Sequence, residues 1–252
     1  MKIDLSGKVA LVTGGTRGIG RAISLALAAS GADVVINYLN DEKSANDVAD
    51  RVTAMGRKAV TVKANVGDSD EVARLFDVVA KHFDKVDIVI SAAALGILRS
   101  ALEVKPRLWQ KVMQINAGAL LSLAQGAVPL MKNQGGRMIA LSSLGSSRVI
   151  PFYSAVGVSK AALESIARNL AFELAPQGIN VNVVCAGVVE TDALKFFPNR
   201  DELVGYSKQR TPAGRLCSPE DVAKVVLFLV SPLADMIHGQ TIVVDGGYSI
   251  VA

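Results

Sequence analysis

A phenol and a primary amine lie close together in the middle of the chain, in a spacing that could serve proton chemistry. Tyr153 precedes Lys160 by seven residues, and the apolar pattern from Val158 onward predicts a helix. Seven residues span almost two helical turns, so the two side chains could share one face, about 10 Å apart along the axis. A cation beside a phenol favours its ionised form, which tunes it as a general acid. Position 156, one turn before the lysine, holds Val, which cannot do this chemistry.

A second chemical signature comes early in the chain. The segment from Thr13 to Gly20 reads Thr-Gly-Gly-Thr-Arg-Gly-Ile-Gly and lies between a predicted strand and a predicted helix. Glycines at 14, 18 and 20 would let the backbone turn tightly, approach a pyrophosphate and pack the helix on the strand. The free N–H groups of the helix N-terminus would then face the phosphates. This context predicts a nucleotide site; the alternative is a glycine-rich turn without a ligand.

The elements that must position these residues alternate along the whole chain. Short β-branched runs predict strands at Val9–Thr13, Asp33–Asn37, Lys58–Lys63, Asp87–Ser91, Arg137–Leu141, Asn180–Val184 and Thr241–Val244. Amphipathic stretches predict helices at Gly20–Ala29, Ser44–Met55, Asp70–Phe83, Lys105–Met131, Val158–Leu174 and Pro219–Leu229. Because no linker or repeat interrupts this alternation, we predict one α/β domain over residues 1–252. It would be a doubly wound parallel sheet of about seven strands with helices on both faces.

With these elements in place, the chain resembles the classical short-chain dehydrogenases/reductases over nearly its whole length. The resemblance rests on the spacing Gly-x-x-x-Gly-x-Gly and on Asn65-Val66, Ser91-Ala92-Ala93-Ala94, Asn116, Ser142-Ser143, Gly187–Thr191 and Asp245-Gly246-Gly247. Ser91 and Ala186 depart from the family's usual Asn and Pro, which indicates a specialised branch. The resemblance implies a Rossmann fold and a nicotinamide cofactor held by Gly14, Thr16, Arg17, Gly18, Ile19, Gly20, Asn37, Asn65, Val66, Ala92, Ala93, Lys160, Gly187, Val189 and Thr191.

The residues around the second strand bear on which nicotinamide cofactor would bind. A carboxylate at the end of this strand would bind the ribose 2′-hydroxyl and reject a 2′-phosphate. Asn37 carries no charge there, and Arg17 is placed to meet a phosphate, so we predict NADPH rather than NADH. Asp41 and Glu42 follow closely and keep NADH open. The alternative for Arg17 is that it simply faces solvent.

The resemblance also implies roles for the polar residues near Lys160. The tyrosine would protonate or hydrogen-bond the substrate oxygen, and Lys160 would hold the nicotinamide ribose and lower the pKa of the phenol. Ser143 and Asn116 would complete the oxygen site and a proton relay. Each has a plainer alternative. Tyr153 could be a packing residue in a loop, Ser143 could cap the next segment, and Asn116 could shape a helix kink and hold water.

The displaced tyrosine decides which carbon would be reduced. A ketone reductase delivers its hydride to the carbon that bears the protonated oxygen, whereas an enoyl thioester reductase delivers it to Cβ and charge develops on the thioester oxygen. A phenol placed further out suits the second reaction. The spacing Tyr-x6-Lys resembles bacterial enoyl-acyl-carrier-protein reductases, most of all the FabL type, in the segments Ser142–Ser146, Val156–Leu163, Thr191–Lys195, Phe197–Arg200, Thr211–Arg215 and Ala234–Ile237.

That resemblance implies NADPH-dependent reduction of a trans-2-enoyl thioester delivered by acyl-carrier protein, in bacterial type II fatty-acid synthesis. One alternative is a 3-oxoacyl or other carbonyl reductase in which Tyr153 bends back to act as the ordinary acid. Another is a catalytically silent nucleotide-binding regulator that has lost its tyrosine at position 156. The presence of Lys160 and Asn116 argues against this last interpretation.

The segment from about 192 to 215 is long for a connection, and we predict that it covers the substrate. Leu194 and Phe197 in this segment, with Leu95, Phe152 and Tyr153, would contact an acyl chain. The alternative is a pair of helices packed permanently on the core. The segment is also basic, which could guide an acidic carrier protein, although a solvated charged face is the default interpretation; its cationic residues are Lys195, Arg200, Lys208, Arg210 and Arg215.

Composition narrows the remaining possibilities. The 252 residues carry a net charge of +4 without a Lys/Arg-rich run, which argues against nucleic-acid binding. The charged N-terminus does not fit a signal peptide, and apolar runs are too short for a bilayer, so we expect a cytoplasmic protein away from membranes. Cys185 and Cys217 lack metal-like spacing, so no metal is expected. The family resemblance implies a homotetramer, to which the apolar faces of Leu120–Leu130 and Leu163–Leu174 are suited.

Overall fold

The computed structural model describes residues 3–131, 135–192, 194 and 200–251. Seven strands form one sheet in the order β3-β2-β1-β4-β5-β6-β7, and every neighbouring pair is parallel. The strands are β1 (Val9–Thr13), β2 (Asp33–Tyr38), β3 (Ala59–Lys63), β4 (Ile88–Ser91), β5 (Gly136–Ser143), β6 (Ile179–Ala186) and β7 (Thr241–Val244). The predicted doubly wound sheet is therefore confirmed.

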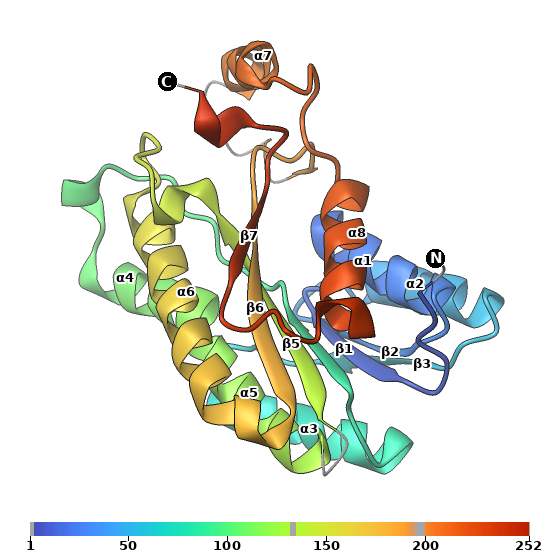
Figure 1. The fold of residues 1–252 in the computed structure, drawn as a ribbon. Coiled ribbons are helices and arrows are strands. Elements are labelled where there is room, and N and C mark those ends of the chain that lie inside the picture. The colour runs from blue at the N-terminus through green and yellow to red at the C-terminus, as the bar shows by residue number, and fades with distance from the viewer. Residues whose placement is uncertain (1–2, 132–134, 193, 195–199, 252) are drawn as a thin grey trace.

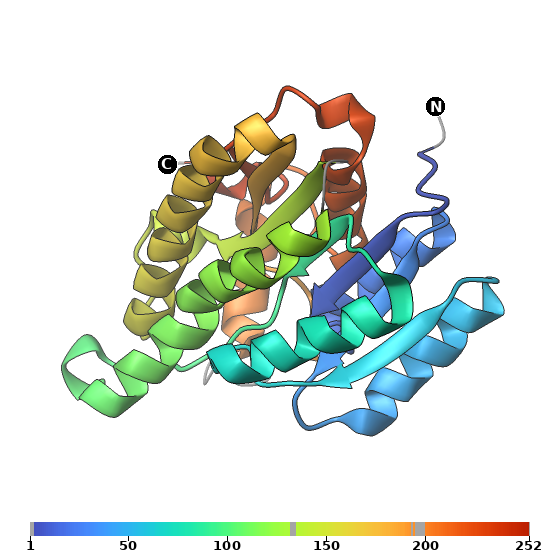
Figure 2. The ribbon, with the colours of Figure 1, turned by 90° about the horizontal axis from the view of Figure 1, so that it is seen from below.

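Helices connect the strands and lie on both faces of the sheet (Figures 1 and 2). They are α1 (Gly18–Ala29), α2 (Glu42–Ala54), α3 (Ser69–Phe83), α4 (Pro106–Met113), α5 (Ala119–Met131), α6 (Ser154–Leu174), α7 (Arg200–Arg210) and α8 (Pro219–Val230). Helices α1, α2 and α8 bury one apolar cluster against the sheet, and α3, α5 and α6 bury another on the opposite face. All residues of β1, β4 and β6 are buried, which explains why these strands lack polar alternation.

The order of the strands reverses between β1 and β4. From β1 the chain adds β2 and β3 on one side, and then returns to place β4 on the other. The carboxyl ends of β1 and β4 lie side by side, with Thr13 opposite Ser91. In doubly wound sheets, ligands bind outside the carboxyl ends of the strands at such a switch point. The fold therefore predicts a crevice at the place where the glycine segment lies.

The structure corrects the sequence prediction in three places near this edge. The predicted helix Lys105–Met131 is interrupted by a π-helical turn, Gln114–Gly118, between α4 and α5. Helix α6 begins at Ser154, one turn before the predicted start, with Tyr153 as its N-cap residue. Strands β5 and β6 run on to Ser143 and Ala186, because their parallel ladder continues past the β-branched runs, with Ser142 opposite Cys185 and Ser143 opposite Ala186.

Helix α7 belongs to the segment predicted to cover the substrate. Figure 1 shows it beyond the carboxyl edge of the sheet, beside the C-terminal turn. The guanidinium of Arg210 donates to the backbone carbonyl of Val251 at 3.2 Å, and the N–H of Ala213 donates to the carbonyl of Gly246 at 3.1 Å. The described part of this segment is therefore a helix tied to the C-terminal residues.

Candidate active site

The glycine segment forms the turn between β1 and α1, at the switch point of the sheet. Gly14 and Gly18 have positive φ angles of 61° and 51°, which residues with side chains rarely adopt. A Cβ on Gly20 would lie 2.2 Å from the carbonyl oxygen of Gly14, so only glycine allows this close packing. In the described chain the N-cap of α1, Arg17, makes no side-chain capping bond, which leaves helix N–H groups available to an anion. The turn therefore fits a phosphate-bearing nucleotide.

Thr13 fastens the loop after β4 to this turn. Its hydroxyl donates to the carbonyl of Ile90 at 3.3 Å and accepts from the N–H groups of Ala92 and Ala93 at 3.0 and 3.2 Å. A Cβ on Gly14 would lie 3.0 Å from the Cα of Ala93. The predicted cofactor residues Ala92 and Ala93 therefore lie against the glycine turn. Sequence analysis missed Thr13, although its place directly before Gly14 marks a hydroxyl at the end of the strand.

The other residues predicted around the nucleotide turn divide into buried and exposed groups. Thr16 is buried, and Ile19 packs on the apolar cluster under α1. Asn37 is also buried, and its amide nitrogen donates to two backbone carbonyl groups at the end of β3, at 3.2 and 2.9 Å. That amide therefore holds β2 to β3.

Arg17 is exposed at the side of the turn that faces the end of β2. The pKa of Asp41 is lowered, first by hydrogen bonds from Ser44 and also by the positive charge of Arg17. Arg17 and Asp41 are thus close enough to interact, at the place where the two cofactors would differ. The arginine favours a 2′-phosphate there and the carboxylate opposes it.

Asn65 and Val66 follow β3 and lie beside the π-helical turn. The Asn65 side-chain oxygen accepts from the N–H of Gly67 at 3.1 Å, and the Asn65 N–H donates to the Glu71 carboxylate at 2.8 Å. Val66 is buried. A Cβ on Gly67 would lie 2.7 Å from the side chain of Ile115, so this loop packs closely on the π-helical turn. Both predicted residues therefore line the same edge as the glycine turn.

Tyr153 is the N-cap residue of α6, and its ring packs on the turn after β5. Burial raises the pKa of Tyr153, and a hydrogen bond with the Ser143 side chain offsets part of this rise. A Cβ on Gly145 would lie 2.6 Å from the tyrosine ring, so the ring rests directly on that glycine. Ser143 also caps the turn, since its hydroxyl accepts from the N–H of Gly145 at 3.2 Å. Val156, at the position one turn before the lysine, is buried in the core.

Lys160 lies in α6 with its side chain turned toward β5. The residue is buried, and Nζ donates to the backbone carbonyl of Leu141 at 2.7 Å. Burial lowers the pKa of Lys160 to about 8. The lysine therefore carries its proton at neutral pH but loses it at a pH only slightly above neutrality.

Asn116 lies in the π-helical turn and joins three elements. Its side-chain oxygen accepts from the N–H of Leu95 at 2.7 Å, and its amide nitrogen donates to the Leu95 carbonyl at 3.1 Å and the Ser159 hydroxyl at 3.0 Å. The Ser159 hydroxyl in turn donates to the carbonyl of Val156 at 2.6 Å. The asparagine thus clamps the loop after β4 to α6, one residue from Lys160. These hydrogen bonds of Asn116 are structural, as expected for a residue that shapes a helix irregularity.

The segment after β6 approaches the glycine turn. The N–H of Gly187 donates to Val244 at 3.0 Å, and Val189 pairs with Cys217. A Cβ on Gly18 would lie 3.4 Å from the methyl group of Thr191, so Thr191 faces the glycine turn. Gly18, Thr191 and Arg200 are among the residues that line a cavity of about 340 Å³. Thr191 therefore lies across from the nucleotide turn, and Gly187 and Val189 precede it on the segment after β6.

The predicted substrate residues are only partly brought together. Leu95 is half-buried beside Asn116, and Leu194 is buried, but Phe152 is 58% exposed. Phe152 also has a positive φ of 62°, unusual for a side chain of this size, and its carbonyl accepts from the N–H of Arg99 at 2.8 Å. Phe197 and the basic residue Lys195 lie outside the described residues.

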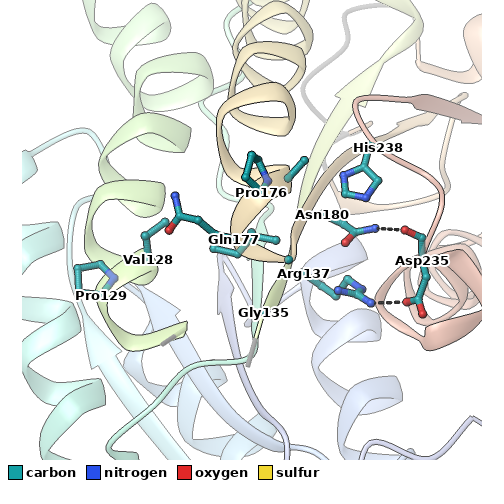
Figure 3. A pocket seen from close by; sticks show the side chains of 12 residues that line it. Val128, Pro129, Gly135, Arg137, Pro176, Gln177, Asn180, Asp235 and His238 are labelled. Carbon is teal, nitrogen blue, oxygen red and sulfur yellow. Dashed lines mark hydrogen bonds and ion pairs between the residues drawn. The ribbon is translucent and has the colours of Figure 1, made fainter. Parts of the chain in front are cut away.

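A second cavity, of about 1070 Å³, lies at the opposite edge of the sheet (Figure 3). Its wall comes from the ends of α5 and α6 and from the loop before β7, where Arg137 pairs with Asp235. None of the predicted site residues lies there. Within the described residues, no three His, Cys, Asp or Glu side chains are grouped to hold a metal ion, and no helix is long and apolar enough to cross a membrane.

Known proteins share this fold and resemble the chain along most of its length. A family model described as "Enoyl-(Acyl carrier protein) reductase" matches residues 14–249. The chain is 40% identical over 247 residues to a 1-cyclohexenylcarbonyl-CoA reductase of Streptomyces collinus, covering 97% of this chain and 88% of that protein. It is 36% identical over 254 residues to versicolorin reductase of Emericella nidulans, covering 96% of each.

A solved short-chain dehydrogenase from Burkholderia cenocepacia, in complex with NADP, superposes with a TM-score of 0.89 at 33% identity and covers 97% of this chain and 99% of its own. The doubly wound sheet with its glycine turn, the family model and the reductase relatives together define an oxidoreductase. This chain belongs to the short-chain dehydrogenase/reductase family.

Proposed function

We propose that this protein is an NADPH-dependent reductase of trans-2-enoyl thioesters, acting in the cytoplasm on substrates of bacterial type II fatty-acid synthesis. The position of the phenol carries the proposal: Tyr153 caps α6 seven residues before Lys160, while buried Val156 occupies the place one turn before the lysine. Two comparisons support reduction of a double bond next to a thioester. The family model is described as an enoyl-acyl-carrier-protein reductase, and the Streptomyces relative is named for a cyclohexenylcarbonyl-CoA substrate.

The cofactor is NADPH in this proposal. The glycine turn supports a nucleotide because a Cβ on Gly14 or Gly20 would meet the backbone of its neighbours, leaving a cradle of bare backbone. Exposed Arg17 supports a 2′-phosphate, and the Burkholderia structure contains NADP. Asp41 nearby is the feature that favours NADH instead.

The residues of this chain would then divide the chemistry as follows. Bound NADPH supplies the hydride. In an enoyl thioester, negative charge then develops on the thioester oxygen, away from the carbon that is reduced. The Tyr153 hydroxyl, held beside Ser143, donates a hydrogen bond to that oxygen. Protonated Lys160 holds the ribose and adds positive charge behind the phenol, and Asn116 keeps the loop after β4 in register with α6.

The substrate arrives on acyl-carrier protein in this proposal, and Leu95, Phe152 and Leu194 would contact its acyl chain. Positive charge near α7 would attract an acidic carrier. Part of that charge is already neutralised, since Arg200 pairs with Asp201 and Arg215 pairs with Asp221. The attraction between this charge and the carrier is therefore expected to raise the association rate more than the affinity.

Reduction of a carbonyl is the second candidate, because Ser143 and Tyr153 share a hydrogen bond. That pair could bind the oxygen of a ketone as well as the oxygen of a thioester. The name of the Emericella relative, versicolorin reductase, is compatible with this alternative.

One experiment separates the candidates: oxidation of NADPH is followed with a crotonoyl thioester and, separately, with an acetoacetyl thioester. We expect turnover of crotonoyl alone in the wild type and loss of about two orders of magnitude or more in kcat in Tyr153→Phe. Turnover of acetoacetyl alone would make the protein a carbonyl reductase. Binding of NADPH without turnover of either thioester would favour a nucleotide-binding regulator or an unrelated substrate.

A further inference from the structure

A small group of polar and titratable side chains lies behind the lysine, between α6 and the sheet. Ser142 and Cys185 are paired across the β5–β6 ladder and are both buried. Glu164 follows Lys160 by four residues on α6, so the two share one face of the helix. The Ser142 hydroxyl donates to the Glu164 carboxylate at 2.5 Å. None of Ser142, Glu164 and Cys185 has a part in the chemistry described above.

The buried position of Lys160 creates a need for negative charge. Removing an ammonium from water favours its neutral form, and burial lowers the pKa of Lys160 to about 8. The backbone carbonyl of Leu141 accepts one hydrogen bond from Nζ but carries no net charge. A fully charged partner nearby would oppose the effect of burial.

Two groups lie close enough to favour the charged lysine, Cys185 on β6 and Glu164 on α6. Cys185 could do so only as a thiolate, and burial raises its pKa to about 12, so it is a neutral thiol over the working pH range. Beyond the cysteine, the Asp245 carboxylate accepts from the N–H groups of Gly247 and Ser249. The phenol of Tyr153 is also neutral near pH 7, because burial raises its pKa.

We propose that Glu164, held in place by Ser142, is a positioning residue that keeps Lys160 protonated at the pH where the enzyme works. The lysine donates to Leu141 and the carboxylate accepts from Ser142, so the two charges interact through space instead of sharing a hydrogen bond. Donation from Ser142 fixes the place of the carboxylate beneath α6. This inference rests on the proposed function only in the role that the charged lysine plays in catalysis; the effect of Glu164 on the charge of Lys160 does not depend on it.

The test measures the charge of Lys160 directly and does not depend on turnover. The protein is labelled with lysine carrying ¹³C at Cε, the Lys160 signal is identified by its loss in Lys160→Met, and its chemical shift is followed from pH 6 to 11. In Glu164→Gln we expect the lysine to titrate about one pH unit lower than in the wild type. At pH 8 the protonated fraction, and with it the affinity for NADPH, would then fall about fivefold.

Two further variants complete the test. Glu173→Gln removes an exposed carboxylate from the far end of the same helix and should leave the titration unchanged. Ser142→Ala keeps the Glu164 carboxylate but removes the hydrogen bond that holds it, so the Lys160 titration should shift in the same direction by a smaller amount. This variant also provides the test if Glu164→Gln fails to fold. An unchanged or raised midpoint in the folded variant would overturn the proposal, whatever thioester the enzyme reduces.

Discussion

The Tyr153 ring rests on the backbone of Gly145, and this contact fixes where the phenol can act. The turn that holds the ring is itself held by Ser143, whose hydroxyl caps it. A Cβ on Gly157 would lie 2.5 Å from the carbonyl oxygen of Gly145, so α6 also packs directly on this turn. The phenol is therefore placed by two glycines as much as by its own neighbours in the sequence.

Gly145→Ala should displace the tyrosine ring, because the new methyl group would meet it at 2.6 Å. We expect kcat on the enoyl thioester to fall about tenfold or more, with little change in the affinity for NADPH, since small displacements of a reacting group are costly. Steady-state kinetics and cofactor fluorescence would measure the two effects. Gly205→Ala in α7 adds its methyl group to open space and is the matched control. Equal losses in both variants would contradict this account.

Arg17→Ala tests the choice of cofactor at the glycine turn. The exposed guanidinium of Arg17 can bind a 2′-phosphate through paired, charge-assisted hydrogen bonds. We expect KM for NADPH to rise about tenfold, the effect of losing one charge-assisted contact of about 1.4 kcal/mol, while KM for NADH stays nearly constant. A parallel rise in both values would show that the arginine does not discriminate between the cofactors.

At the scale of elements, long-range polar contacts determine the local irregularities. The π-helical turn Gln114–Gly118 forms around Asn116, whose partner Leu95 lies 21 residues away. The pattern of apolar residues does not indicate a long-range hydrogen bond between Asn116 and Leu95, so the sequence predicted one long helix there. The seven strands were predictable because β-branched runs mark them, but the ends of β5 and β6, at Ser142 and Cys185, are set by pairing with neighbouring strands.

Asn116→Ala should destabilise the junction of the loop after β4 with α6. Three hydrogen bonds are lost and the Leu95 N–H is left without its partner, which costs about 2–3 kcal/mol in the free energy of unfolding. Denaturant unfolding would measure this. Asn169→Ala removes an exposed amide from α6 that donates to the Ser165 carbonyl of the same helix, and should cost less than about 0.5 kcal/mol. Similar costs in the two variants would contradict the clamping role of Asn116.

Asp87 joins the starts of β1 and β4, and it makes stability depend on pH. Burial raises the pKa of its carboxyl, but bonds from the N–H of Val9 and from Lys85 and Lys8 outweigh burial and lower it. Because the pKa is lower in the folded state, the stabilisation is present above the pKa of the unfolded chain and is lost as the pH falls through the folded value.

Asp87→Asn should therefore reduce the free energy of unfolding by about 1–3 kcal/mol at pH 7, since both lysines lose their buried anion. The difference from the wild type should shrink as the pH is lowered below about 4. Unfolding midpoints measured between pH 3 and pH 7 would test this. If the difference in stability between Asp87→Asn and the wild type stays constant over that range, the lost stability comes from altered packing and not from the lost charge.

At the scale of the whole molecule, apolar side chains remain on the outer surface of α5 and α6. Phe172 is 84% exposed and Leu121 is 43% exposed. A second copy of the chain would cover them in the homotetramer that the family resemblance implies. Phe172→Asp should then lower the mass measured by light scattering, while Met55→Asp at the end of α2 should not. A tetramer that survives the first substitution would place the interface elsewhere.

Thr13 and Ala92, which together fix the nucleotide turn, are 79 residues apart in the sequence. On a ribosome that adds about 5–20 residues per second, the turn is made roughly 4–16 seconds before the strand that completes it. During this interval the nascent chain can pair β1 with β2 and β2 with β3, but it lacks β4, which completes the switch point and the bonds of the Thr13 hydroxyl. Acquisition of nucleotide affinity during synthesis would therefore mark the moment when the two halves of the sheet join at β4.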